Sequence, residues 1–124
     1  MIRKIGYIIF AHGSRVESAN DGVRLVTAEF IQRGSIDLAE TAFLELAEPD
    51  LSAAVDALAA RGATEICVLP YFLTLGMHLQ RDLPKLASEA AARHPALEIK
   101  IAPPLHGHPG LAGILLERAA EVQG

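Results

Sequence analysis

Short apolar runs and amphipathic stretches alternate along the whole chain. Ile5 to Ala11 is a run of mostly β-branched and aromatic residues, which is typical of a strand buried on both faces of a parallel sheet. Similar short runs at Thr41 to Leu46, Glu65 to Leu69 and Leu97 to Ala102 predict three more strands. Each run is followed by a stretch in which apolar residues recur at helical spacing.

The first two amphipathic stretches have recognisable ends. Ser18 to Arg33 predicts one helix, which Gly34 is placed to stop. Asp50 is placed to cap a second helix, which ends at Gly62. The inward face of the first helix is expected to consist of Val23, Val26, Phe30 and Ile31.

The last two helices are marked by proline. Asp82 is placed to cap a third helix, in which Pro84 is tolerated in the first turn. Pro109 opens a fourth helix. Its apolar positions are Leu111, Ile114, Leu115 and Ala119.

Strands and helices that alternate in this way predict an α/β fold with a parallel sheet and right-handed crossovers. Helices on both faces require the strand order to reverse, so we expect the order 2-1-3-4. Ligands of such folds bind beyond the carboxyl ends of the strands, where the order reverses. The 124 residues fit one domain, residues 1–124.

Composition narrows the class of protein. The chain is 51% hydrophobic and 21% charged, which is typical of a globular protein. Its net charge of −4 argues against nucleic-acid binding. Its single cysteine, Cys67, excludes a disulfide within the chain, and we expect it to lie in the core. No apolar run is long enough to span a membrane. The first apolar run lacks a signal-peptide cleavage site, so we expect a cytoplasmic protein.

Three polar residues from distant parts of the chain follow strands. His12 follows the first strand, Glu45 ends the second, and His78 lies in the predicted loop after the third. All three should therefore meet at the carboxyl edge of the sheet. Two imidazoles and a carboxylate can bind a divalent metal ion such as Co²⁺, Fe²⁺, Ni²⁺ or Zn²⁺, or can accept protons. Each residue alone is more commonly an ordinary turn or surface residue.

The loops at the same edge carry further candidates. The segment from Tyr71 to Met77 is too apolar for a solvated loop, so it could wall a pocket, pack under the sheet or form a subunit interface. Arg15, Arg81 and Lys85 could bind carboxylates. Two further histidines follow the fourth strand and are either turn residues or ligand contacts: His106 and His108.

Several familiar sites are missing from the sequence. No GxxxxGKS or GxxxxGKT segment is present to cradle nucleotide phosphates, and no GxGxxG follows the first strand. Ser14 lacks the GxSxG context of a nucleophile elbow. The sequence therefore gives no reason to expect an organic cofactor.

Four segments, taken together, resemble a known family. AHGSR follows the first strand, AFLELAEPDL covers the second, LPYFLTLGMHLQRDLP follows the third, and PPLHGHPGL follows the fourth. In this order they are similar to the short sirohydrochlorin chelatases, which include cobalt, iron and nickel enzymes. The resemblance covers essentially the whole chain. The family has one histidine before Pro-Gly in the last segment, and His106 is an additional one here.

The resemblance implies a flavodoxin-like fold and the insertion of a divalent metal into a tetrapyrrole without ATP. It implies that His12 and His78 bind metal or accept protons, and that Glu45 is the active-site glutamate. The sequence does not say which of the two histidines binds the metal and which accepts protons. The short relatives are homodimers, so a homodimer is expected here. We expect the anionic tetrapyrrole sirohydrochlorin to contact Ser14, Arg15, Phe72, Leu75, Arg81 and His108.

Three other functions remain as alternatives. A metal carrier or storage protein could use the same histidines without catalysis. A histidine phosphatase would carry Arg-His-Gly, whereas this chain has Ala11-His12-Gly13, and a receiver domain would need an aspartate where Leu69 and Pro70 stand. For a chelatase, Co²⁺ is the first candidate metal, and Fe²⁺ and Ni²⁺ are the alternatives. The product would enter cobalamin or a sirohaem-type cofactor.

Overall fold

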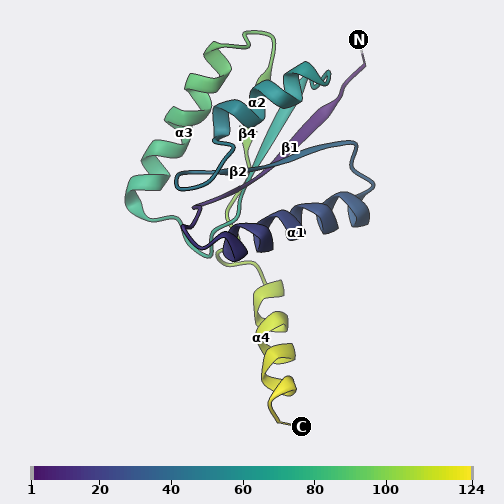
Figure 1. Ribbon diagram of the computed structural model, residues 1–124, viewed down its shortest axis with the longest axis vertical. Helices are drawn as coiled ribbons and strands as arrows, with labels where there is room; N and C mark the ends of the chain where they lie inside the picture. Colours follow the sequence, from purple (N-terminus) through teal and green to yellow (C-terminus); the bar gives the residue numbers. More distant parts are fainter. Residues whose placement is uncertain (1, 124) are drawn as a thin grey trace.

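Four parallel strands form the sheet of this protein (Figure 1). The computed structural model describes residues 2–123. The strands lie in the order β2-β1-β3-β4, which confirms the predicted α/β fold and places the reversal between β1 and β3. The strands are β1 (Ile5–Ala11), β2 (Leu38–Phe43), β3 (Glu65–Pro70) and β4 (Glu98–Ile101).

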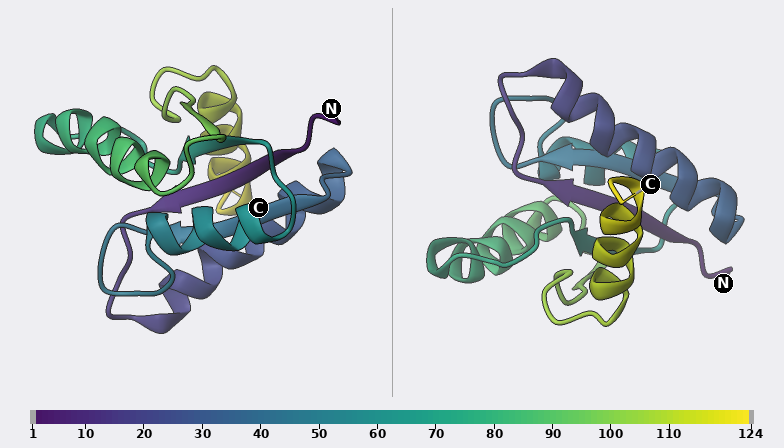
Figure 2. Two further views of the ribbon diagram at one scale, coloured as in Figure 1. Left: turned by 90° about the horizontal axis from the view of Figure 1, so that it is seen from above. Right: turned by 90° about the horizontal axis from the view of Figure 1, so that it is seen from below.

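Helices lie on both sides of the sheet. α1 packs against β1 and β2, whereas α2 and α3 cover the opposite face (Figure 1). In the view from above, α2 and α3 are nearest the reader, and in the view from below α1 and α4 are (Figure 2). The helices are α1 (Glu17–Gly34), α2 (Leu51–Ala60), α3 (Met77–Ala92) and α4 (Gly110–Glu121). None of the described helices is long and apolar enough to cross a membrane.

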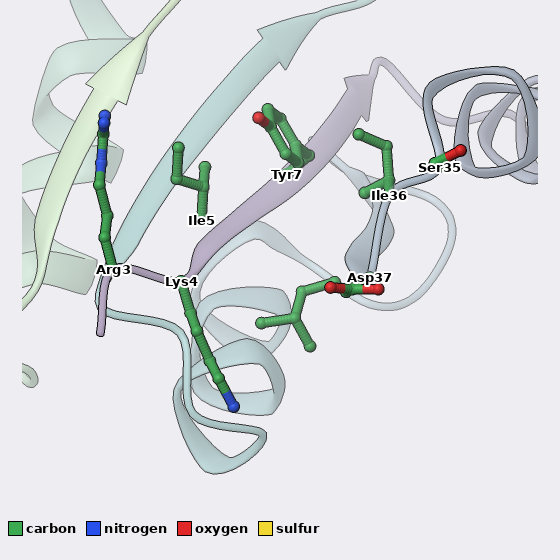
Figure 3. Close-up of a pocket in the computed structure, with 8 residues that line it drawn as sticks. Arg3, Lys4, Ile5, Tyr7, Ser35, Ile36 and Asp37 are labelled. Atoms are coloured by element: carbon green, nitrogen blue, oxygen red, sulfur yellow. The ribbon is translucent and has the colours of Figure 1, made fainter.

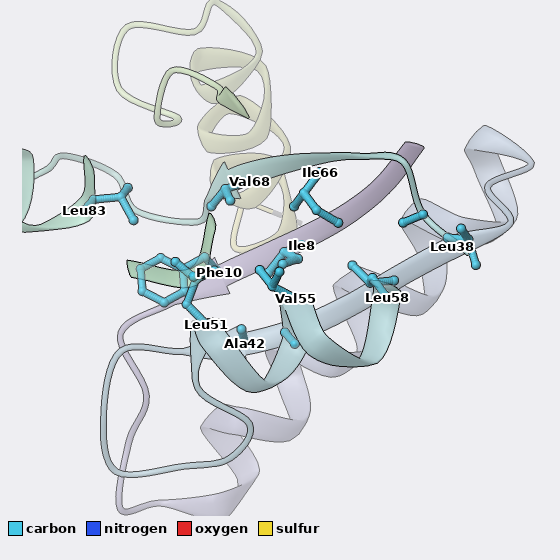
Figure 4. Close-up of a cluster of buried hydrophobic side chains, with 13 residues drawn as sticks. Ile8, Phe10, Leu38, Ala42, Leu51, Val55, Leu58, Ile66, Val68 and Leu83 are labelled. Carbon is cyan, nitrogen blue, oxygen red and sulfur yellow. The ribbon is translucent and has the colours of Figure 1, made fainter. Parts of the chain in front are cut away.

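The core fills the space between the sheet and α2 (Figure 4). Alternate residues of β1, Ile8 and Phe10, point into it because successive side chains of a strand face opposite ways. α2 contributes one face at helical spacing, and Asp50 caps it as predicted by accepting a hydrogen bond from Ala53 N at 2.9 Å. Fully burying a large apolar side chain, such as Ile8 or Phe10, contributes about 1.5–3 kcal/mol to the free energy of unfolding. The α2 residues in the core are Leu51, Ala54, Val55 and Leu58.

Two elements begin more than two residues before their predicted start, and the boundaries of the other elements agree to within two residues. β2 spans Leu38–Phe43 rather than Thr41 to Leu46. α3 begins at Met77, and Gly76 rather than Asp82 is its N-cap, so Pro84 lies inside the helix. The physical reason for the longer helix is Leu79, which packs against the core one turn before Leu83 and extends the apolar face of α3 towards its N-terminus.

The inward face of α1 is more polar than predicted. Its buried residues are Asn20 and Thr27, and Ile31 is exposed. Thr27 faces the sheet because its hydroxyl accepts a hydrogen bond from Thr41 Oγ1 at 2.7 Å and donates one to Val23 O at 3.2 Å. The predicted contribution of Phe30 is confirmed, since its ring meets the Tyr7 ring edge-on at 5.5 Å. Cys67, expected in the core, is only half-buried on this side of β3.

α4 forms where Pro109 predicts a helix, but it does not pack on the sheet. Figure 1 shows it projecting away from the rest of the molecule. None of its described residues is buried. The apolar face expected from Leu111 and Ile114 is therefore present in the sequence but is uncovered in the structure.

Candidate active site

The backbone brings His12 and Glu45 together at the carboxyl edge. His12 directly follows β1, and Glu45 lies two residues beyond the end of β2. Hydrogen bonds between the two chain segments continue past the strands: Leu44 N donates to Ala11 O at 2.9 Å, and Glu45 N donates to His12 O at 3.1 Å. The backbones of His12 and Glu45 are therefore paired by hydrogen bonds, so the two side chains leave the chain at neighbouring positions.

The His12 and Glu45 side chains face one another. His12 Nε2 lies 3.5 Å from Glu45 Oε1, and both side chains are more than half exposed. His12 Nδ1 lies 3.0 Å from Gly13 O. Because a carbonyl oxygen only accepts, Nδ1 carries the hydrogen in that contact, and a neutral ring then keeps a lone pair on Nε2. A lone pair opposite a carboxylate creates a position suited to a proton or a metal cation.

Gly13 allows this close approach. Its φ is +93°, a conformation that other residues rarely adopt. A Cβ atom added to Gly13 would lie 1.8 Å from Glu45 O, so a larger residue could not occupy the position without moving the Glu45 backbone. The glycine therefore holds His12 and Glu45 in register.

Asn20, which sequence reasoning missed, holds the loop after His12. It is buried in the first turns of α1. Its Oδ1 accepts from Ser14 N at 2.9 Å, and its Nδ2 donates to Ser14 O at 2.8 Å and to Glu17 Oε2 at 3.1 Å. Hydrogen bonds from Arg24 and Asn20 lower the pKa of the Glu17 carboxyl. The only signal in the sequence is an asparagine in the first turns of an otherwise amphipathic helix.

His78 lies in the first turn of α3 rather than in a loop. It lines a pocket of about 410 Å³ together with His12, Phe72 and Met77, so the structure brings both histidines to one cavity. The other lining residues are Leu44, Thr74, Gly76, Leu79 and Asp82. Among residues 2–123, no group of three or more His, Cys, Asp or Glu side chains is close enough to hold a metal ion. The histidines therefore face a shared space without forming a closed three-ligand cage.

The two histidines have different hydrogen-bond partners. His78 Nδ1 lies 3.0 Å from the Arg81 guanidinium. Because a guanidinium only donates, Nδ1 is the acceptor, and the hydrogen of a neutral ring then sits on Nε2. In this arrangement His12 offers a lone pair on Nε2, whereas the lone pair of His78 is occupied by Arg81.

Apolar side chains lie beside the two histidines. The Phe72 ring is half-buried, with its centroid 6.1 Å from that of Phe10. Leu75 is half-buried, while Leu73 and Met77 are largely exposed. Of the apolar side chains, Leu44, Phe72, Met77 and Leu79 line the pocket, whereas Leu73 and Leu75 lie outside its lining. An apolar wall next to polar groups suits a ligand with an apolar face.

The remaining predicted contacts lie outside the lining of this pocket. Ser14 Oγ accepts from Val16 N at 3.0 Å, and Arg15 is exposed beside it. His108 Nδ1 accepts from Gly110 N at 2.9 Å at the start of α4, and His106 is exposed. Phe72 is thus the only one of the six predicted substrate contacts among the described lining residues, although Arg81 reaches the pocket through His78.

Comparison with known proteins identifies the family. The CbiX family model matches residues 6–122. The chain is 33% identical over 123 residues to the sirohydrochlorin cobaltochelatase of Saccharolobus solfataricus, with 94% of each chain covered. It is 32% identical over 113 residues to the chloroplastic sirohydrochlorin ferrochelatase of Arabidopsis thaliana, which covers 91% of this chain. The chain spans about half (50%) of that plant relative.

Solved structures agree with the sequence comparison. The cobalamin biosynthesis CbiX protein of Marinobacter aquaeolei superposes with a TM-score of 0.83 at 29% identity, covering 94% of this chain and 95% of that chain. The sirohydrochlorin chelatase SirB of Bacillus subtilis subspecies spizizenii, in complex with cobalt, superposes with a TM-score of 0.89 at 28% identity. That match covers 96% of this chain and 51% of SirB. On the family match over residues 6–122 and the relatives above 30% identity, this chain belongs to the CbiX family.

Proposed function

We propose that this protein is a sirohydrochlorin chelatase that inserts a divalent metal ion into the tetrapyrrole without ATP. The observation that carries the proposal is the pairing of His12 with Glu45 beside a pocket that His78 also lines. Relatives named as cobalto- and ferrochelatases support the reaction class. The metal is a substrate, with Co²⁺ as the first candidate and Fe²⁺ or Ni²⁺ as alternatives.

Insertion exchanges two pyrrole protons for one divalent cation. The cation arrives hydrated, and protein ligands lower the barrier by replacing part of its water shell before it passes to the ring nitrogens. His12 Nε2 supplies a neutral nitrogen ligand for this step, and Glu45 Oε1, 3.5 Å away, supplies a negative charge that can assist proton removal. So few protein ligands leave most coordination positions of the cation open, which favours transfer over storage.

His78 is suited to receive a pyrrole proton once its Nδ1 is free. Arg81 occupies that nitrogen in the structure. Sirohydrochlorin carries carboxylates, which compete strongly for a guanidinium because they form charge-assisted, bidentate hydrogen bonds. Binding of the substrate would therefore draw Arg81 away and release the base. Ser14, Arg15, Phe72, Leu75 and His108 are proposed as further substrate contacts.

The functional unit is proposed to be a homodimer with the two carboxyl edges facing each other. The pocket is open on one side, and Leu73 and Met77 beside it are 66% and 82% exposed. A second copy would cover this apolar surface and enclose a flat macrocycle. A cytoplasmic location and a role in cobalamin or sirohaem-type biosynthesis complete the proposal.

A metal titration of the reaction tests the function. Sirohydrochlorin absorbance is followed with enzyme and Co²⁺, Fe²⁺ or Ni²⁺ in turn, against the uncatalysed rate with each metal. We expect acceleration with at least one metal, and its loss in His12→Ala. Binding of Co²⁺ without any change in the tetrapyrrole spectrum would favour a metal carrier instead.

A further inference from the structure

Arg24 extends from α1 to the segment of chain that follows β2. Its Nη1 donates hydrogen bonds to Glu17 Oε1 at 2.6 Å and to Asp21 Oδ1 at 2.8 Å. Its Nη2 points to Glu48 O at 3.5 Å, and its guanidinium carbon lies 5.3 Å from the centroid of the Phe43 ring. Arg24 therefore contacts both its own helix and the chain that leads away from β2.

The segment that faces this guanidinium also carries Glu45. We call residues 44–49 the Glu45 loop. A hydrogen bond from Phe43 N to Pro49 O at 2.8 Å closes its base, and Glu45 N donates to His12 O at 3.1 Å. The guanidinium contacts the later half of the loop. The loop is therefore held from one side by the backbone after β1 and from the other side by α1.

The Glu45 loop contains a residue in a strained conformation. Leu46 has a φ of +67°, in the left-handed region that a leucine rarely adopts. Strain of this kind persists only where the surrounding structure holds the chain in place. Leu46 lies between Glu45, which is bonded to the chain after β1, and Glu48, which faces Arg24. Loss of either attachment would let the loop relax and would turn the Glu45 side chain away from His12.

The same arginine is tied to the loop that follows His12. Glu17 accepts from Arg24 through Oε1, and it accepts from Asn20 Nδ2 through Oε2 at 3.1 Å. Asn20 in turn is bonded to the backbone N and O atoms of Ser14. A continuous set of hydrogen bonds therefore runs from the loop after β1, through α1, to the loop after β2.

The charges of this network persist at neutral pH. Hydrogen bonds from Arg24 and Asn20 lower the pKa of the Glu17 carboxyl, and hydrogen bonds to Glu17 and Asp21 raise the pKa of the Arg24 guanidinium. A single exposed ion pair stabilises a protein little, but here one planar guanidinium joins two carboxylates, a carbonyl and an aromatic face. Phe43 is fully buried, so the ring beneath the guanidinium is fixed by packing.

We propose that Arg24 is a positioning residue for metal insertion, which fixes the Glu45 loop and thereby keeps Glu45 Oε1 directed at His12 Nε2. The inference rests on the proposed function, because that function assigns metal binding and proton removal to this pair. Arg24 lies outside the lining of the pocket that the two histidines share. A displacement of about 1 Å can slow a reaction about 10²-fold, so a residue that positions Glu45 affects the rate without touching the reactants.

The kinetic test separates positioning from attraction of the substrate. Arg24→Met keeps a side chain that covers the Phe43 ring but removes the guanidinium. We expect kcat for insertion to fall about tenfold, and KM for sirohydrochlorin to change less than about twofold, because the lost contacts do not reach the substrate. An unchanged kcat, or a KM that rises as much as kcat falls, would overturn the proposal.

A double variant shows whether Arg24 acts through Glu45. In the Glu45→Gln background, the charge that Arg24 positions is already absent. Adding Arg24→Met should therefore slow insertion less than about twofold further, since two changes that act through one group are not additive. A further loss of about tenfold in that background would show that the two residues act independently, and the positioning role would be wrong.

Arg61→Met is the matched control. Arg61 also donates to a backbone carbonyl, Asp37 O at 3.3 Å, and its Nη1 lies 3.6 Å from Glu40 Oε1. Figure 3 shows Asp37 at the other end of β2, beside a hollow of about 450 Å³ whose lining includes neither His12 nor Glu45. The variant loses the same charge as Arg24→Met, and its kcat and KM should stay unchanged. An equal loss of kcat in both variants would show a general effect of charge and would contradict the proposal.

Amide hydrogen exchange measures the positioning without metal or substrate. Glu45 N donates to His12 O in the unaltered protein. Arg24→Met should accelerate exchange of the Glu45 amide about tenfold, because a loosened loop opens this bond more often, while the amides within β1 exchange at their original rates. Arg61→Met should change neither. An unchanged Glu45 amide in Arg24→Met would refute the role of Arg24. If the unaltered protein inserts no metal, the proposed function is wrong, and the exchange rates still show whether Arg24 positions Glu45.

Discussion

His12 Nε2 lies 3.5 Å from Glu45 Oε1, although the two residues follow different strands of the sheet. The contact is set by backbone rather than by side-chain flexibility, since Glu45 N donates a hydrogen bond to His12 O. With Nδ1 turned to Gly13 O, the remaining ring nitrogen and the carboxylate define one cation position. This geometry makes separate predictions for the carboxylate and for the imidazole.

Removing the charge of Glu45 should slow insertion more than it weakens metal binding. Glu45→Gln keeps the size and a hydrogen-bonding oxygen but loses the anion that faces His12. We expect insertion to slow by about 10²-fold, the lower range for loss of a proton-transfer group, with Co²⁺ affinity falling less than about tenfold. Steady-state rates and a calorimetric Co²⁺ titration measure the two quantities.

Glu48→Gln is the matched control for that change. It alters another carboxylate of the same loop, and Glu48 forms no ion pair with His12 among the described residues. Both its insertion rate and its Co²⁺ affinity should match the unaltered protein. Equal losses of rate and affinity in Glu45→Gln would instead make Glu45 a principal metal ligand.

His12 and His78 should each be required for insertion but not for folding. Both side chains are exposed at the edge of the sheet, and substitutions at such positions usually change the free energy of unfolding by less than about 0.5 kcal/mol. His12→Ala and His78→Ala should therefore unfold at nearly the same urea concentration as the unaltered protein while losing insertion activity. Full turnover in either variant would remove that histidine from the site.

Arg81 should act mainly through the substrate's carboxylates. Arg81→Met frees His78 Nδ1 but removes the guanidinium, and hydrogen bonds to charged groups contribute about 1.5–3 kcal/mol. We expect the KM for sirohydrochlorin to rise at least tenfold, with a smaller change in kcat. Arg93→Met removes a cation at the other end of α3, where Arg93 pairs with Asp56 at 2.6 Å. The KM of Arg93→Met should not change. A similar rise of KM in both variants would show that the effect depends on net charge and not on the position of Arg81.

The sequence predicted the sheet order and the partnership of His12 with Glu45 because both depend on local patterns. Strand runs alternate with amphipathic stretches, and parallel strands share a carboxyl edge. The β2 boundary moved, yet Glu45 still met His12, since the hydrogen bonds continue past the strand to Leu44 and Glu45. An error of a few residues at a strand end therefore left the site intact.

Other features depended on tertiary contacts that no local pattern contains. The sequence predicts a loop at His78 because Asp82 and Pro84 are typical of a helix start, whereas the packing of Leu79 extends the helix to Met77. The sequence does not reveal the role of Asn20, because that role depends on hydrogen bonds to the Ser14 backbone. The uncovered α4 could not be foreseen either, since the periodicity of Leu111 and Leu115 predicts an apolar side without saying what covers it.

The last prediction concerns Gly13, on which the His12–Glu45 geometry depends. Gly13→Ala introduces a Cβ whose ideal position is 1.8 Å from Glu45 O, at a φ of +93°. Strain of this kind contributes about 1–3 kcal/mol, and the Glu45 backbone must also move. We expect the free energy of unfolding to fall by about 2 kcal/mol or more, and insertion to fall with it under conditions where the protein is still folded.

Gly22→Ala is the control, because Gly22 lies inside α1 with no heavy atom within 4 Å of the added Cβ. There the substitution should stabilise the protein by about 0.5–1 kcal/mol, since glycine weakens a helix interior. Urea unfolding of the three proteins measures the difference, and equal midpoints for the two variants would show that the Gly13 backbone relaxes without moving Glu45.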